Sequence, residues 1–172
     1  MPSGKTHDWT TLAFLPFVWL IGQWGLHWGF WVCALVTLGT FIGGFWLSPD
    51  LDTRSRPFYR WGVLRFIWWP YHWAVRHRSV LSHGIWFASW LRLLYLSAVL
   101  ALLYIASSHT LSRLGNISIH QPRQDILRFV HAHTHDILWL GLGIWTGSLL
   151  HILLDKLCSS LGRWPHSRQK RR

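Results

Sequence analysis

Residues 28–47 read WGFWVCALVTLGTFIGGFWL, a run of 20 residues without a charged side chain. A helix needs about 20 apolar residues to cross the roughly 30 Å hydrocarbon core of a bilayer. This run therefore predicts a transmembrane helix from Trp28 to Leu47. The composition of the whole chain agrees, because 51% of its 172 residues are hydrophobic, which is a high fraction for a water-soluble domain.

Three other apolar runs predict three more spans. The first extends from Trp9 to Trp24 and is short, with Pro16 inside it. The others are Ile85–Ala106 and Ile137–Leu154. The run Ile85–Ala106 carries one charge, Arg92, about 10 Å from its start, so we expect that side chain to reach the interface. The sequence thus predicts an all-α integral membrane bundle of about four transmembrane helices.

The segment between the second and third spans, residues 48–84, is amphiphilic, because arginines are interleaved with tryptophans and tyrosines. This composition is typical of a membrane–water interface. Pro70 must interrupt any helix there, which predicts two short pieces lying on the membrane. Residues 107–136 predict a polar loop. We expect one membrane-embedded helical domain over residues 1–160 and a basic cytoplasmic tail over residues 161–172.

The net charge of +11 arises from 17 basic and 6 acidic residues. In a soluble protein such a charge suggests a nucleic-acid partner, but no recognition motif is present and the basic residues flank the apolar runs. We therefore expect membrane lipid as a partner and no nucleic acid. Thirteen Lys and Arg residues lie in the N-terminus, residues 48–84 and the tail from Lys156, against three in residues 107–136. The positive-inside rule then places both termini in the cytoplasm.

Short polar islands interrupt the apolar sequence, and the densest of them reads RHRSVLSHG at residues 76–84. All six acids are Asp, and four of them fall in the other islands. Imidazole and carboxylate groups are common ligands of divalent metals. In the predicted topology, seven such residues reach the cytoplasmic ends of the spans and form the candidate metal site: His7, Asp50, Asp52, His77, His83, His151 and Asp155.

Parts of this set also have simpler interpretations. His151 and Asp155 are four residues apart, so they share a helix face and could bind one ion or form a capping ion pair. Asp50 and Asp52 could instead cap a turn. A competing cluster at residues 131–135 has the spacing HxHxH, which is typical of a metal tract. The predicted topology places that cluster on the opposite side of the membrane.

Four motifs together resemble a known group of proteins. They are PSGKTHD at residues 2–8, LSPDLD at 47–52, RHRSxxSHG at 76–84, and the final pair His151 and Asp155. They resemble an uncharacterised group of predicted metal-binding membrane proteins common in cyanobacteria. That group is distantly similar to the YdjM-like inner-membrane proteins, which are described as metal-dependent hydrolases. The resemblance spans nearly the whole chain and implies a metal site in a bacterial inner membrane or a thylakoid membrane.

The leading functional hypothesis is a membrane-embedded, metal-dependent hydrolase that acts on a phosphate ester or a lipid-linked substrate at the cytoplasmic face. His and Asp ligands without Cys suit Zn²⁺, Mn²⁺ or Fe²⁺, and we expect Zn²⁺. Because the chain contains no Glu, the catalytic base would be Asp52 or His83. Arg76 and Arg78 would clamp an anionic phosphate.

Two other functions are open at this stage. One is a metal-free lipid phosphatase in which a histidine attacks phosphorus, but Ile144 and Trp145 occupy the positions where that family carries Ser-Arg. The other is a metal-stabilised membrane scaffold or assembly factor, whose ligands tie helices together. A closed four-ligand site is structural and an open site is catalytic, and the sequence does not distinguish the two.

Overall fold

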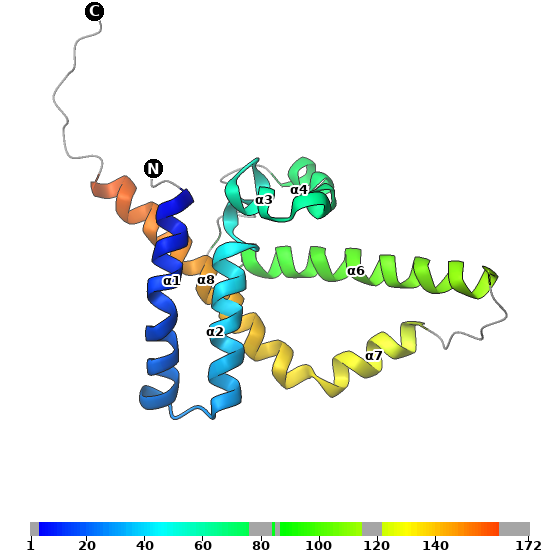
Figure 1. The fold of residues 1–172 in the computed structure, drawn as a ribbon, viewed down its shortest axis with the longest axis horizontal. Helices are drawn as coiled ribbons and strands as arrows, with labels where there is room; N and C mark the ends of the chain where they lie inside the picture. Colours follow the sequence, from blue (N-terminus) through cyan, green and yellow to red (C-terminus); the bar gives the residue numbers. More distant parts are fainter. Residues whose placement is uncertain (1–3, 76–83, 85–86, 115–121, 162–172) are drawn as a thin grey trace, which may run out of the picture.

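The computed structural model describes residues 4–75, 84, 87–114 and 122–161. Every regular element in that part of the chain is helical (Figure 1), which confirms the predicted all-α class. The elements are α1 (Gly4–Leu20), the π-helical η1 (Ile21–Gly25), α2 (Phe30–Phe45), the 3-10 helix η2 (Pro49–Asp52), α3 (Arg56–Arg60), the 3-10 helix η3 (Gly62–Trp68), α4 (Trp69–Ala74), α6 (Phe87–Leu114), α7 (Pro122–Ala132) and α8 (Thr134–Leu161).

Three helical stretches are long and apolar enough to cross a membrane. They are Phe30–Asp52 with 23 residues, and Phe87–Arg113 and Thr134–Ser160 with 27 residues each. These stretches correspond to the second, third and fourth predicted spans. Helix α1 has 17 residues, fewer than the ~20 that a span requires. The first span, and with it a bundle of four transmembrane helices, stays a prediction.

The centre of the molecule is the crossing of α2 and α8, where the two backbones touch through glycines. The contact is made by Gly39, Gly43, Gly143 and Gly147. A Cβ atom built on any of the four would lie 2.2–2.3 Å from a carbonyl oxygen of the facing helix. Both pairs are spaced four residues apart, the pattern by which small residues let membrane helices approach closely. As a result, the last turns of α8 lie beside the end of α2.

Helix α1 runs antiparallel to α2 and packs against it (Figure 1). Thr11 of α1 fits against Gly44 of α2, where a Cβ atom would lie 2.5 Å from the Thr11 hydroxyl oxygen. The same hydroxyl donates a hydrogen bond to the His7 carbonyl oxygen at 3.0 Å. These contacts bring the start of α1 to the level at which α2 and α8 end.

The described chain after α2 forms four short helices, η2, α3, η3 and α4, and not the two pieces predicted from the sequence. Pro57 and Pro70 occupy the first turns of α3 and α4, where the missing N–H group of proline costs nothing. Pro70 therefore restarts a helix, as expected, but Pro57 starts one as well. Gly62, with φ of +53°, begins η3 and allows the change of direction between the pieces.

This aromatic segment has a buried side and an exposed side. Leu51, Trp68 and Tyr71 lie in the main hydrophobic core, whereas Val63 and Trp73 are 88% and 95% exposed. Exposed tryptophans beside arginines are typical of a surface that lies against lipid headgroups. The amphiphilic character predicted for residues 48–84 is therefore present as two distinct faces in the described part of that segment.

The predicted polar loop at residues 107–136 is wrong over most of its described length. Helix α6 continues to Leu114, and α7 (Pro122–Ala132) is an amphipathic helix that leads into α8. The high polarity of this region suggested a loop, yet its apolar residues recur with helical spacing and pack toward α6. Figure 1 shows α6 and α7 extending away from α1 and α2.

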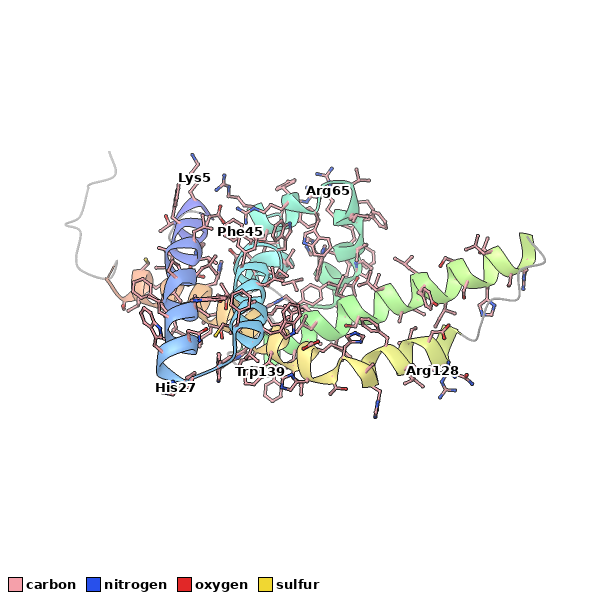
Figure 2. The ribbon with its side chains drawn as sticks, turned by 60° about the horizontal axis from the view of Figure 1, so that its bottom comes forward. Lys5, His27, Phe45, Arg65, Arg128 and Trp139 are labelled. Carbon is pink, nitrogen blue, oxygen red and sulfur yellow. The ribbon has the colours of Figure 1, made fainter. Side chains whose placement is uncertain are left out.

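Basic residues mark one end of the molecule. Figure 2 shows Lys5 of α1 and Arg65 of η3 at the same end, and His27 and Trp139 at the other. At that second end, the Trp31 indole N–H donates to the Asp136 carboxylate at 3.1 Å and joins the start of α2 to the start of α8. The placement of Lys5 and Arg65 at one end is consistent with the basic-residue count behind the predicted orientation. The membrane topology itself stays a prediction.

Candidate metal centre

Four of the predicted ligands come together where α1, α2 and α8 meet. His7 comes from the first turn of α1, and Asp50 from η2, directly after α2. His151 and Asp155 lie one turn apart on α8, so both side chains point to the same side of the helix. Three separate elements thus supply imidazole and carboxylate groups to one place.

The donor atoms of His7, His151 and Asp155 are close enough to share one ion, and Asp50 lies beside His151. The His7 Nε2 atom lies 3.3 Å from Asp155 Oδ1, and the His151 Nε2 atom lies 3.3 Å from Asp50 Oδ2 and 3.8 Å from Asp155 Oδ2. The two imidazole rings stack with their centroids 3.8 Å apart. Among the described residues, His7, His151 and Asp155 are the one group whose donor atoms all lie within 4.8 Å of one another.

These separations match a metal site. A tetrahedral zinc ion with bonds of about 2.0–2.1 Å holds its ligand atoms about 3.3–3.4 Å apart. The His151 Nε2 atom is buried and has no hydrogen-bond partner among the described residues, even though two carboxylates face it. A buried imidazole nitrogen left without a hydrogen bond is costly. A divalent ion between the imidazoles and the carboxylates would remove that cost.

Ser48 sets the tautomer that metal binding needs. Its hydroxyl lies 3.1 Å from His151 Nδ1, and both residues are buried. If Nδ1 carries the proton and donates it to Ser48, the lone pair of Nε2 faces the carboxylates, the usual arrangement for a ligating histidine. Ser48 follows α2 directly, so the end of that helix orients the ring.

His7 is held in its neutral form. Burial lowers its pKa, and the neighbouring His151 ring lowers it further, while Asp155 and Asp50 oppose the shift. Only a neutral imidazole has a lone pair to offer a metal. The surroundings of His7 therefore favour the state that binds an ion.

A cavity of about 310 Å³ lies beside these donors. His7, His151 and Asp50 form part of its wall, and Arg54 and Arg56 form another part. Asp8 also lines this cavity and forms ion pairs with Arg56, at 2.9 Å, and with Arg60. The donor cluster therefore has open space on one side and basic side chains around that space.

Asp52 lies near the cluster but faces another way. It is buried, and its carboxylate interacts electrostatically with Arg92 and Tyr71. Asp50 and Asp52 are alternate residues of one turn, which separates their directions. Neither Asp50 nor Asp52 belongs to the group of three closely spaced donors, but Asp50 lies 3.3 Å from His151 Nε2; the role of Asp52 as a ligand or base stays a prediction.

Arg92 is the residue that sequence reasoning placed wrongly. The side chain does not reach the interface but is fully buried, with 0% exposure. Its guanidinium donates to the Ser89 hydroxyl at 3.3 Å and to the Ser148 hydroxyl on α8 at 3.1 Å. Ser148 lies about one turn before His151, so Arg92 braces the part of α8 that carries the donor cluster. The available signals in the sequence were Ser89, three residues before Arg92, and Ser148, three residues before His151.

The structure does not test the remaining predicted site residues, and the competing histidines lie apart from the cluster. Arg76, His77, Arg78 and His83 lie outside the described residues. The competing histidines at residues 131–135 are exposed. Within that group, His133 hydrogen-bonds through Nδ1 to the Phe129 carbonyl oxygen at 3.0 Å, and His135 accepts from the Trp139 indole at 2.9 Å. Their contacts are local contacts of adjacent helical turns.

Comparison with known proteins identifies the family. The model of the family described as "Uncharacterized metal-binding protein (DUF2227)" matches residues 2–165. The chain belongs to this family. This DUF2227 chain is also 33% identical to an "Uncharacterized protein" of Aquifex aeolicus (strain VF5) over 130 residues, which cover 74% of this chain and 92% of the relative. No solved structure matches it.

Membership of the DUF2227 family confirms the predicted metal-binding class. The match covers His7, Asp50, His151 and Asp155, so the donor cluster lies within the family's region. The likeness to cyanobacterial proteins and to YdjM-like hydrolases is not addressed by these comparisons and stays a prediction.

Proposed function

We propose that this protein is a membrane-embedded, metal-dependent hydrolase that acts on a phosphate ester or lipid-linked substrate at the cytoplasmic face. The observation that carries the proposal is the buried His151 Nε2 atom, which faces two carboxylates at ligand spacing and has no hydrogen bond within the described part of the chain. His7, Asp50, His151 and Asp155 would hold a divalent ion, with Zn²⁺ favoured over Mn²⁺ or Fe²⁺ for this donor set.

When bound, such an ion supplies Lewis-acid chemistry, which lowers the pKa of water towards neutrality. The protein's own residues would do the rest. Ser48, with its hydroxyl at hydrogen-bond distance from His151 Nδ1, would favour the ligating tautomer, and Arg92 joins α6 to α8. The cavity beside the donors leaves room for a substrate, which supports an open, catalytic site over a closed structural one.

The roles of base and phosphate clamp follow from the sequence. Asp52 and His83 are the candidate bases, and Arg76 and Arg78 the candidate phosphate ligands. Asp52 is buried and interacts electrostatically with Arg92, so we propose His83 before Asp52 as the base. The proposed site lies in a bacterial inner or thylakoid membrane, with both termini in the cytoplasm.

A second function is favoured by one observation, namely that the four donors come from three different elements. An ion bound there would join α1, η2 and α8 and stabilise the fold. This is the arrangement of a metal-stabilised scaffold or assembly factor. The two functions differ in their need for a substrate, so an activity measurement separates them.

The metal part is tested by mass spectrometry of the full-length protein purified in detergent. We expect about one zinc ion per chain, and at least tenfold less in His151→Ala and Asp155→Ala. His133→Ala is the matched control, because this histidine is exposed and outside the cluster, and it should keep the metal. Equal metal content in all four proteins would refute the site.

The hydrolase part is tested by phosphate release from a panel of lipid and nucleotide phosphates. Loss of a general base typically lowers the rate about 10² to 10⁴-fold, so His83→Ala should lose activity and keep its metal. Asp52→Asn tests the other candidate, and Arg78→Gln should weaken substrate binding with the metal content unchanged. A metal-loaded wild-type protein that is inert on every substrate would favour the scaffold.

A further inference from the structure

A second cavity adjoins the one at the metal centre. It measures about 470 Å³ and is lined by Arg54, Phe58, Trp69, Pro70, His72 and Trp73. Arg54 also lines the 310 Å³ cavity beside the donor cluster. Ligand pockets commonly measure about 300–1,000 Å³, so each cavity alone could hold a part of a ligand. Arg54 thus lines both the aromatic cavity and the cavity beside the donor cluster.

Arg54 differs from the arginines next to it. Arg56 and Arg60 both form ion pairs with Asp8. In the part of the chain that the structure describes, Arg54 forms no such pair, and its side chain is exposed. An exposed guanidinium outside an ion pair can donate two parallel hydrogen bonds to a phosphate. The charge at the junction of the cavities is therefore suited to an anionic headgroup.

The walls of the second cavity are suited to a hydrocarbon chain. Trp69 and Trp73 remain 61% and 95% exposed, so an apolar ligand lying against them would cover surface that is now bare. Around the cavity the aromatic segment exposes other apolar side chains, among them Val63 and Leu64 at 88% and 53%. Such a surface is expected to lie at the bilayer interface, which is where a lipid would enter.

The cavity is also linked to the turn that carries Asp50. The His72 ring, in the cavity wall, hydrogen-bonds to the Leu51 carbonyl oxygen and packs on the Phe58 ring with a centroid distance of 4.9 Å. Leu51 is the direct neighbour of Asp50. A ligand seated in the aromatic cavity would therefore contact a side chain, His72, that is hydrogen-bonded to the short helix carrying Asp50.

We propose that the aromatic cavity binds the hydrocarbon chain of a lipid phosphate, whose phosphate group sits at Arg54 and faces the metal centre. The inference rests on the proposed function and names its substrate class as a membrane lipid with a terminal phosphate monoester. A soluble nucleotide shares the phosphate but lacks the chain, so the two can be told apart.

The test measures binding to the full-length protein in phosphatidylcholine nanodiscs by titration calorimetry. The probes are dioctanoyl phosphatidic acid, inorganic phosphate and AMP. Arg54→Gln should weaken phosphatidic acid about tenfold or more, because it removes a charge-assisted hydrogen bond, and should weaken inorganic phosphate as well. Trp73→Ala should weaken phosphatidic acid about five- to tenfold through lost apolar contact and leave inorganic phosphate unchanged.

Two control variants match these changes. Arg65→Gln removes an exposed arginine of the same segment that does not line the cavity, and Trp24→Ala removes a tryptophan that is 72% exposed and lies far from it. Both should bind phosphatidic acid like the wild type. Wild-type affinity in both Arg54→Gln and Trp73→Ala would overturn the proposal, and so would AMP that binds as tightly as phosphatidic acid.

The result separates this inference from the proposed function. If the purified protein holds no metal and yet Arg54→Gln and Trp73→Ala weaken phosphatidic acid as expected, the lipid-phosphate site is supported and the metallohydrolase is refuted. If the protein holds its metal but Arg54→Gln and Trp73→Ala leave the affinity for phosphatidic acid unchanged, the lipid-phosphate site is refuted and the proposed metal centre is not.

Discussion

Replacing Gly147 by alanine tests whether the contact between α2 and α8 sets the geometry of the metal centre. The new Cβ atom would lie 2.3 Å from the Thr40 carbonyl oxygen and 2.7 Å from the Gly44 nitrogen. Real Cβ contacts are essentially never shorter than 3.0 Å. Both obstacles are backbone atoms, which cannot rotate away, so the two helices must separate by about 0.7 Å or more.

That displacement is large for a metal site. His151 lies one turn beyond Gly147, about 6 Å along α8, so its ring moves with the helix. Ligand distances must hold to about ±0.2 Å for tight binding, and the His151 Nε2 atom would shift relative to Asp50 by several times this amount. We expect metal affinity to fall about 10–100-fold, as when the support of a ligand is lost.

Stability should change less than affinity. Overpacking costs about 1–3 kcal/mol, and the higher helix propensity of alanine returns about 1 kcal/mol. Metal affinity, measured by competition with a chelator, is therefore the sharper assay, with helix content recorded by circular dichroism. Gly29→Ala is the control, since a Cβ atom there meets nothing within 4 Å. A folded Gly147→Ala protein with wild-type metal affinity would refute this reasoning.

Three other outcomes are expected. Chelation should lower the melting temperature of the wild type, because a ligand at 100 times its Kd contributes about 2.7 kcal/mol, whereas His151→Ala should show no such shift. Arg92→Met should cost about 1–3 kcal/mol in a denaturant titration, because it removes the hydrogen bonds that the buried guanidinium donates to Ser89 and Ser148; a loss below about 0.5 kcal/mol would contradict the assigned role. Reporter fusions at Arg172 and Gly115 should report opposite sides of the membrane, and a common side would remove the four-span topology.

Much of the fold was predictable because apolar runs of span length leave few alternatives. The run from Trp28 to Leu47 contains α2, residues 87–106 of the third run lie within α6, and the fourth run lies within α8. The gathering of His7 and Asp50 beside α8 was also predictable, because chain direction alone places the ends of alternate helices at one level. Depth in the membrane, however, does not determine which residues at that level touch.

The contacts that decide this could not be predicted from the sequence. Gly39 and Gly43 have the spacing of a helix contact, and so do Gly143 and Gly147, but the sequence does not say that the two pairs face each other. Arg92 was expected at the interface because its partners, above all Ser148, become visible only once α6 and α8 are placed together. Local pattern thus predicted the elements, and tertiary contacts decided the site.

Charge balance links these contacts to the proposed ion. Burying a carboxylate is costly unless a cation compensates it, and this protein brings four Asp side chains and the buried Arg92 into one region of the fold. Arg92 interacts electrostatically with Asp52, and Arg56 and Arg60 form ion pairs with Asp8. Asp50 and Asp155 face two imidazoles instead, one of which is held neutral. A divalent cation brings two positive charges to these two carboxylates, so binding it would balance the cluster and at the same time fix α8 against α1 and η2.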